Sequence, residues 1–314
     1  MSDKRSGLDT AINKLESLIG QNQENIVQYR QEPSTLNSNY IYSNEILTAA
    51  WLPRRLSKKD QTMFDRSFGG LTFITTSGHN RDKTPIGLPS GSIARKLFIS
   101  LIDKAYRTQS PVVDFQSVYG LLKDVGLTIQ TNNRRKVHDQ FKRLSTCRVE
   151  IYWTPGNVAP GKHLRFQGSM FDFAEMYEVY DKDQLLLIPN KVVFTPRFFS
   201  EIVQRGGFGY LTELLRKTNS PIEIDILLWL VRRVAFTHDG VDIPVASLKQ
   251  QFSTKRMSNY DFVRWFSAPL DNVCRLVGID QHKWDDEYLC LPPLRPEQKK
   301  MAFRYNPILE NKGT

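Results

Sequence analysis

The sequence predicts an α+β protein in which one order of helices and strands occurs twice, preceded by a short helical or flexible arm. An apolar run at residues 90–108 is long enough for a helix and leads into an extended stretch at 112–115. The same succession returns at 220–237 and 241–244. A third observation is charge: 43 Lys and Arg against 33 Asp and Glu leave a formal net charge of +10 over 314 residues, which favours a polyanionic partner.

Residues 1–39 are expected to form an arm outside the main fold. Leu8, Ile12 and Leu15 recur at helical spacing, so the sequence predicts a short amphipathic helix there. A Gln- and Asn-rich stretch follows and has the composition of a linker. The arm is either a flexible tail or a segment for self-association or for another partner.

The first half continues with a predicted short helix at 117–126, a strongly basic helix at 132–145 and a strand at 147–153. Helix, strand, helix, helix and hairpin is the order of a winged-helix DNA-binding domain, whose third helix can lie in the major groove. The strand at 147–153 is therefore expected to open the wing. A Gly- and Pro-rich loop and further extended segments follow it.

The second half completes the same order with elements at 245–252, 258–278 and 286–292. Pro269 falls inside the third helix, where proline removes a backbone hydrogen bond and clashes with the preceding turn. We therefore expect a kink or a break near Ser267. Residues 282–284 are expected at the tip of the second wing, unless Trp284 packs against the core instead.

Gly206, Gly207 and Gly209 indicate a break between the two halves. The sequence therefore predicts an N-terminal helix and polar linker, a first winged-helix domain, a second winged-helix domain and a C-terminal tail, at residues 1–39, 40–205, 206–296 and 297–314 respectively. A single larger α+β domain is the alternative.

The basic helix of the first half has one apolar and one cationic face. Val137, Phe141 and Leu144 are spaced to pack inward. An arginine that points outward can read guanine with two hydrogen bonds, and a lysine can neutralise phosphate. The expected DNA contacts in this half are Arg134, Arg135, Lys136, His138 and Lys142. The alternative is a charged face that contacts only solvent.

The third helix of the second half shows the same division. Phe262, Phe266 and Val273 share a face that should pack inward. Two cations come just before the helix, and an asparagine opens it. The expected DNA contacts in this half are Lys255, Arg256, Asn259, Tyr260 and Arg264.

No pattern in the sequence indicates a catalytic, metal or cofactor site. The three cysteines are far apart, the five histidines are isolated, and no spacing singles out a carboxylate pair. Residues 156–163 (GNVAPGKH) approach a phosphate-binding loop, but His163 replaces the hydroxyl that binds magnesium and Pro160 removes an N–H group. We expect a protein that is not an enzyme and needs no cofactor.

The sequence also bears on location. It contains neither an apolar run of about 18 residues nor an N-terminal hydrophobic signal core. Three well-separated cysteines fit a reducing compartment. We expect a soluble cytoplasmic protein with no membrane partner.

Six blocks of the sequence resemble RepA-type plasmid replication initiators of bacteria. The first half contains GLPSGSIARKLFISLIDKAYRTQSPVVDF, LLKDVGL and RRKVHDQFKRLSTCRVEI. The second half contains SPIEIDILLWLVRRVAF, SLKQQF and NYDFVRWF, followed by a wing that ends in LPP. The resemblance extends over residues 86–293. The sequence departs from the family at Ser90, where a tyrosine or similar residue usually follows GLP, and at Ala268 and Pro269 in the last helix.

The resemblance implies a non-enzymatic, tandem winged-helix protein, associated with the plasmid or nucleoid in the bacterial cytoplasm. Such proteins bind repeated sites (iterons) in the double-stranded DNA of a plasmid origin. They promote opening of an adjacent AT-rich segment and recruit host replication proteins such as a helicase and an initiator. Related initiators often repress their own promoter as homodimers and act at the origin as monomers. The positions carried over from the family are Arg134, Arg135, His138, Lys142, Asn259, Tyr260 and Arg264.

Three other functions are compatible with the same residues. A winged-helix transcriptional repressor would bind DNA without origin activity. A DNA-nicking enzyme would relax supercoiled DNA in the presence of a divalent metal. A protein-interaction module would not shift DNA in a gel.

Overall fold

The computed structural model describes residues 38–44, 48, 51–56, 60–115, 118–126, 134–153, 164–175, 190–203, 207–236, 239–253, 255–279, 281–285 and 287–305. The expected N-terminal helix and the loop at 156–163 lie outside these residues. Within them the chain is α+β, as the sequence predicts, with helices packed around four small antiparallel sheets.

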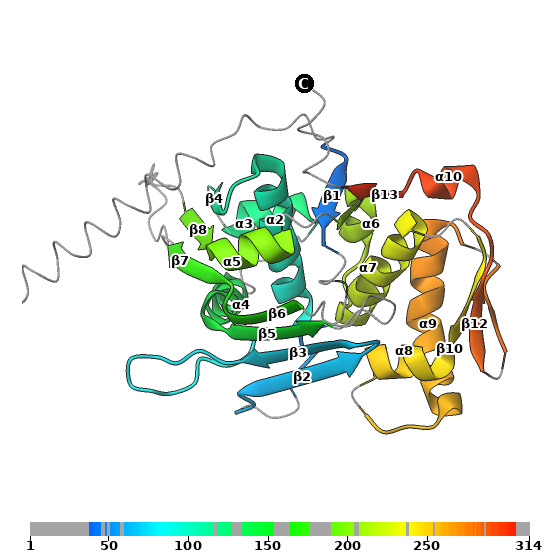
Figure 1. The fold of residues 1–314 in the computed structure, drawn as a ribbon, viewed down its shortest axis with the longest axis horizontal. Coiled ribbons are helices and arrows are strands. Elements are labelled where there is room, and N and C mark those ends of the chain that lie inside the picture. The colour runs from blue at the N-terminus through cyan, green and yellow to red at the C-terminus, as the bar shows by residue number, and fades with distance from the viewer. Residues whose placement is uncertain are drawn as a thin grey trace, which may run out of the picture.

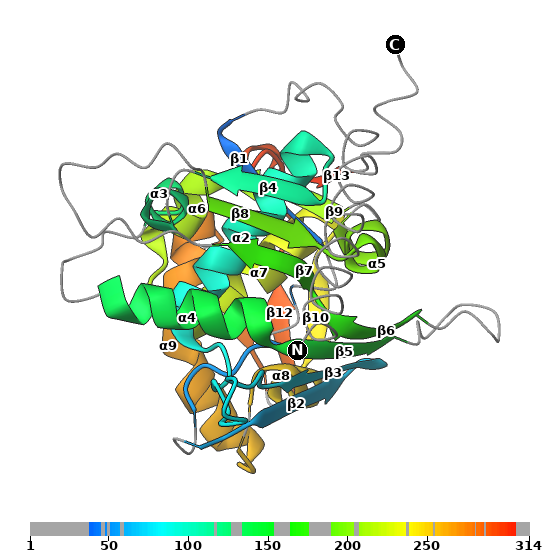
Figure 2. The ribbon, with the colours of Figure 1, turned by 90° about the vertical axis from the view of Figure 1, so that its left-hand side faces the viewer.

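The first half contains a unit of three helices and a three-stranded sheet, which we call the first unit. Its elements are α2 (Gly91–Thr108), β4 (Val112–Phe115), α3 (Val118–Asp124), α4 (Arg134–Thr146), β7 (Phe171–Glu175) and β8 (Asn190–Phe194). The strands pair in the order β4-β8-β7, and α2 packs against α3 and α4. In Figure 2, α4 crosses the front of the molecule below this sheet.

The second half contains a unit with the same order, which we call the second unit. Its elements are α7 (Pro221–Phe236), β10 (Val241–Pro244), α8 (Val245–Phe252), α9 (Asn259–Val277), β11 (Lys283–Trp284) and β12 (Tyr288–Leu291). The strand order β10-β12-β11 repeats that of the first unit, because in both units the first strand pairs with the last. Figure 1 shows α4 at the left and α9 at the right, with α2 and α7 between them.

The strand expected at 147–153 does not open the wing of the first unit. It belongs to a separate four-stranded sheet of β2 (Met63–Phe68), β3 (Leu71–Thr76), β5 (Arg148–Trp153) and β6 (Leu164–Ser169). Val149 and Ile151 alternate toward the core, but any half-buried strand shows this pattern, so it does not identify the partner. Strands β7 and β8 occupy the place of the wing instead.

Helix α9 runs through Pro269 without the break that we expected near Ser267. The Ser267 hydroxyl donates to the Val263 carbonyl oxygen at 2.7 Å. Phe266 and Leu270, on either side of the proline, are fully buried, and α9 packs against α7. Tertiary packing thus keeps the helix continuous despite the backbone hydrogen bond that proline cannot donate.

The fourth sheet pairs strands from the two ends of the described chain. Its order is β1 (Tyr40–Ser43), β9 (Gly207–Leu211), β13 (Ala302–Tyr305). A Cβ atom at Gly207 would lie 2.0 Å from the Ser43 carbonyl oxygen, so this glycine permits the close pairing of β9 with β1. Part of the expected C-terminal tail is ordered, as α10 (Pro296–Lys299) and β13. The remaining connections are α5 (Pro196–Phe198), a π-helical turn (Phe199–Val203) and α6 (Thr212–Lys217).

One hydrophobic core extends through both units. Helix α2 contributes Leu97 and Leu101, and helix α7 contributes Leu227 and Leu230, all at most 1% exposed. The two helices contact each other. The two units therefore repeat one order of elements while sharing an interior.

Candidate nucleic-acid interface

Packing fixes which face of α4 points outward. Val137, Phe141 and Leu144 are at most 3% exposed, as their spacing predicts. The Phe141 ring meets the Phe115 ring of β4 edge-on, with centroids 6.0 Å apart. The opposite face of the helix is consequently turned away from the core.

The cations expected on that face lie mostly in solvent. Arg135, Lys136 and Lys142 are exposed, whereas His138 is half-buried. The Lys142 ammonium donates to the side chain of Asn80 at 3.0 Å, which ties the helix to the loop that precedes α2. Helix α4 begins at Arg134, whose side chain is outside the described part of the structure.

One neighbouring arginine has a structural role instead. Arg143 donates to the Leu88 carbonyl oxygen at 3.3 Å. A Cβ atom at Gly87 would lie 2.5 Å from the Arg143 guanidinium, so glycine makes room for this side chain. Arg143 therefore anchors α4 to the segment before α2 and is not available to a ligand on the outer face.

The apolar face of α9 is buried in the same way. Phe262, Phe266 and Val273 are at most 1% exposed. Ser258 caps the helix: its hydroxyl accepts a hydrogen bond from the Asp261 N–H at 3.0 Å. Packing and capping together fix the orientation of the first turn of α9.

All five residues expected to contact DNA in the second unit are exposed: Lys255, Arg256, Asn259, Tyr260 and Arg264. Tyr260 is 74% exposed, and tyrosine is enriched at interfaces because its ring is apolar at one end and polar at the other. The Asn259 side-chain oxygen accepts a hydrogen bond from the Lys249 ammonium at 2.7 Å, which turns the asparagine NH₂ group outward as a donor.

A groove that the sequence did not reveal lies beside these residues. It has a volume of about 1000 Å³ and lies between β2 and the turn from α8 to α9. Arg55 and Lys255 line it with exposed cations, while Asp65 is its one acidic residue among those described. Arg55 is 200 positions from Lys255 in the sequence, and only the packing of α8 on β2 brings them together. The adjacent arginines after Pro53 were the sequence signal that could have identified this site.

The second wing differs from our expectation. His282 is paired with Asp271 at 2.8 Å, and the Trp284 ring packs edge-on against Phe266 at 6.4 Å. The turn between β11 and β12 contains Asp285 and Glu287, both exposed. Carboxylates at this tip repel phosphate, so the tip of the second wing is not a basic contact.

Cys147, directly before β5, is buried. Burial raises the pKa of the Cys147 thiol to about 12, so this side chain stays protonated and is a poor nucleophile. The described residues contain no cluster of three or more histidine, cysteine or carboxylate side chains that could hold a metal ion. Among the described helices, none combines the length and the apolar character that a membrane span requires.

Comparison with known proteins finds similar solved structures, two of which are described below. No family model and no curated protein matches the sequence. A crystal structure of RctB domains 2-3 (RctB-155-483) is similar with a TM-score of 0.49 and 15% identity, over 82% of this chain and 99% of that chain. A structure of selenomethionine derivatives of domain 2 and domain 3 of RctB is similar with a TM-score of 0.47 and 15% identity, over 83% of this chain and 94% of that chain.

Proposed function

We propose that this protein binds double-stranded DNA through both units and initiates plasmid replication from repeated origin sites. The observation that carries the proposal is the repeated architecture: each unit has a third helix whose apolar face is buried and whose outer face bears exposed cations. Helices of this kind fit the major groove of B-DNA.

The two kinds of contact have separate roles in the proposed complex. Arg135 and Arg264 would donate paired hydrogen bonds to guanine and thereby read sequence. Lys136, Lys142 and Lys255 would neutralise phosphates and supply affinity that depends on salt. Because the surface carries both kinds of side chain, it can fix the position of the protein along the DNA and also distinguish base sequences.

The role in replication rests on the resemblance of residues 86–293 to RepA-type initiators. On this proposal the protein works in the bacterial cytoplasm, binds iterons, promotes opening of an adjacent AT-rich segment and recruits host replication proteins. It acts by binding alone, with no catalytic centre and no cofactor. Self-association as a homodimer would serve repression of its own promoter.

The first test is a footprint of the intact protein on the DNA that flanks its gene. We expect protection of direct repeats, with contacts in successive major grooves about 10 bp apart on one face of the duplex. A plasmid that carries the gene and these repeats should replicate, and deleting the repeats should abolish its replication. Protection without replication would favour a transcriptional repressor.

A second experiment separates binding from catalysis. Supercoiled DNA is incubated with the protein and magnesium, and we expect a mobility shift without nicking. Lys299→Ala serves as the matched control for variants of the interface, because Lys299 is an exposed cation on α10, outside both units. Nicking by the wild-type protein would contradict the proposal, as would the absence of any shift.

A further inference from the structure

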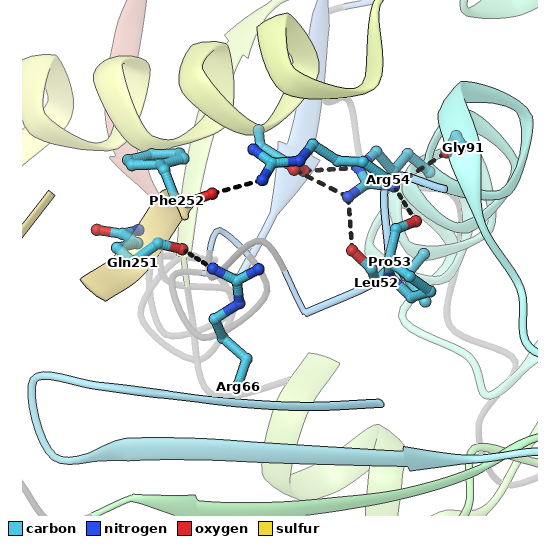
Figure 3. A network of polar contacts seen from close by, with 9 residues as sticks. Leu52, Pro53, Arg54, Arg66, Gly91, Gln251 and Phe252 are labelled. Carbon is cyan, nitrogen blue, oxygen red and sulfur yellow. Dashed lines mark hydrogen bonds and ion pairs between the residues drawn. The ribbon is translucent and has the colours of Figure 1, made fainter. Parts of the chain in front are cut away.

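Two arginines from the first half of the chain bind the end of α8 in the second unit. The Arg66 guanidinium donates to the carbonyl oxygens of Gln251 at 2.7 Å and of Ser253 at 3.1 Å. The Arg54 guanidinium donates to the carbonyl oxygen between them, that of Phe252, at 2.6 Å. Figure 3 shows both side chains directed at the last turn of α8.

The chemistry of a helix end explains why arginine occupies both positions. The last carbonyls of a helix have no partner within it and carry the negative end of the helix dipole. A guanidinium offers several N–H donors in a rigid plane, so Arg66 can bridge two carbonyls where an ammonium would hold its donors in a different geometry. The three carbonyls immediately precede the turn that leads into α9.

Arg54 also reaches α9 itself. Its guanidinium carbon lies 4.9 Å from the centroid of the Trp265 ring. Trp265 follows Arg264, one of the expected DNA contacts, and lies in the N-terminal half of α9. Arg54 therefore contacts both helices on either side of the turn, through a hydrogen bond to α8 and a cation–π contact to α9.

A buried ion pair holds the segment that carries Arg54. Arg95 of α2 pairs with Asp225 of α7 at 2.6 Å, with both side chains at most 5% exposed. The same guanidinium donates to the carbonyl oxygens of Leu52 at 2.7 Å and of Pro53 at 3.2 Å. The ion pair thus joins the first helices of the two units and fixes the backbone immediately before Arg54.

Burial lowers the pKa of both arginines, and Arg54 still stays charged. It lowers the pKa of Arg54 to about 10, and it also lowers the pKa of Arg66, while Asp225 opposes both shifts. A pKa near 10 keeps Arg54 protonated at neutral pH. The contacts of Arg54 therefore do not act as a pH switch near neutral pH.

A continuous path runs from α4 to this clasp, by which we mean Arg54 and Arg66 together. Strand β5 follows α4 after a single residue and pairs with β3, and β3 pairs with β2, which carries Arg66. Each of these strand pairs is held by backbone hydrogen bonds in a defined antiparallel register. The four-stranded sheet thus links the third helix of the first unit to the turn before α9.

We propose that Arg54 and Arg66 are positioning residues that hold α9 at one fixed placement relative to α4, so that the protein accepts only one spacing and rotational phase between its two half-sites. The inference rests on the proposed function, in which α4 and α9 each bind a half-site. It goes beyond that function, because tandem DNA-binding units joined flexibly would tolerate several spacings.

The experiment uses the intact chain and a duplex selected by it from a random-sequence pool. A series of probes inserts one to about 5 bp, half a helical turn, between the two protected half-sites. We expect the wild-type protein to lose affinity on the order of 100-fold at the longest insertion, because one unit can then no longer engage. The double variant Arg54→Gln/Arg66→Gln should bind the original spacing on the order of 10-fold more weakly and lose no more than about 3-fold on insertion.

Arg197→Gln is the matched control. Arg197 also donates to a backbone carbonyl, that of Arg165, but both residues belong to the first half of the chain. This variant should keep the wild-type affinity and the full penalty for insertion. A double variant that keeps the wild-type penalty for insertion would overturn the inference.

A second readout does not depend on DNA. Spin labels at Ser145→Cys on α4 and Ala268→Cys on α9, in a Cys290→Ser background, report the distance between the two helices. We expect one narrow distance in the otherwise wild-type protein and a broad distribution in the double variant. Equal, narrow distance distributions in the two proteins would overturn the inference. Failure to select any duplex would overturn the proposed function, and the distance measurement would still decide whether the clasp positions α9. If the double variant does not fold, the single variant Arg54→Lys takes its place, with the same broadening expected to a smaller extent.

Discussion

The two units share one arrangement of elements but anchor their third helices differently. Helix α4 is held by its own half: Phe141 packs on Phe115, and Arg143 binds the segment before α2. Helix α9 has a local cap at Ser258, yet the turn before it is held by Arg54 and Arg66 from the other half. Two units with the same topology can therefore differ in how far each depends on the other. The third helix of the first unit is anchored within its own half, whereas that of the second unit is also held by residues of the first half.

The largest expected effect comes from breaking the link between the units. Asp225→Ala removes the buried partner of Arg95 and should lower the free energy of unfolding by about 3–5 kcal/mol, because an uncompensated charge remains in the interior. Urea denaturation measures it. Glu213→Ala, which removes the exposed partner of Lys217, should cost less than about 1 kcal/mol. Similar losses in the two variants would show that the units do not depend on their shared interior.

The next largest effect is the loss of DNA affinity when one arginine is removed from α4 or from α9. Arg135→Ala and Arg264→Ala should each weaken binding to the selected duplex by about 1–3 kcal/mol, if each arginine pairs with a guanine. Titrations on selected and random-sequence duplexes measure this difference, with Lys299→Ala as the control. An equal loss on both duplexes would assign the arginine to phosphate contact, and the unit concerned would not read sequence through it.

A smaller effect tests how much of the α9 anchor is local. Ser258→Ala removes the hydroxyl that caps the helix and should lower the free energy of unfolding by about 1 kcal/mol. Ser145→Ala near the end of α4, whose hydroxyl donates to the Lys142 carbonyl oxygen, should change it by no more than about 0.5 kcal/mol. Thermal unfolding of both variants gives the comparison. A negligible effect of Ser258→Ala would assign the anchoring of α9 to the packing of its apolar face and to the clasp.

The smallest effect concerns the groove between β2 and the turn before α9. If Arg55 neutralises one phosphate, Arg55→Gln should reduce the steepness of log affinity against log salt by about 0.9. The slope is measured on random-sequence duplex, where phosphate contacts dominate. An unchanged slope would exclude Arg55 from the interface while leaving the contacts of α4 and α9 in place.

The spacing of apolar residues predicted the elements that are defined by contacts between residues close in the sequence. The helices at α2, α4, α7 and α9 follow from apolar spacing, and so do the inward faces of α4 and α9. The wing of the first unit was misassigned because β5 pairs with β3, more than 70 residues earlier, and alternation of apolar residues does not encode a partner. Of the kink or break expected near Ser267, the break does not occur, because burial of the flanking face outweighs the preference of proline.

The residues of the candidate site also fall into those that local sequence predicts and those that depend on distant contacts. The outward positions of Arg135, Lys142, Tyr260 and Arg264 could be deduced from helical spacing, because packing of the opposite face determines them. The groove and the clasp could not, because each combines residues that lie 185 to 200 positions apart in the sequence. The acidic tip of the second wing is visible in the sequence, but the pairing of β11 with β12 was needed to locate the turn.

The sheet that joins the ends of the described chain has a practical consequence for shortening this protein. Strand β13 covers one edge of β9, and its Phe303 ring packs on the rings of Tyr40 and Tyr42 at 5.0 and 6.0 Å. A version trimmed to end before Ala302 would expose that strand edge together with aromatic surface, a combination that invites aggregation. A version shortened at the C-terminal side should therefore retain all residues up to and including residue 305.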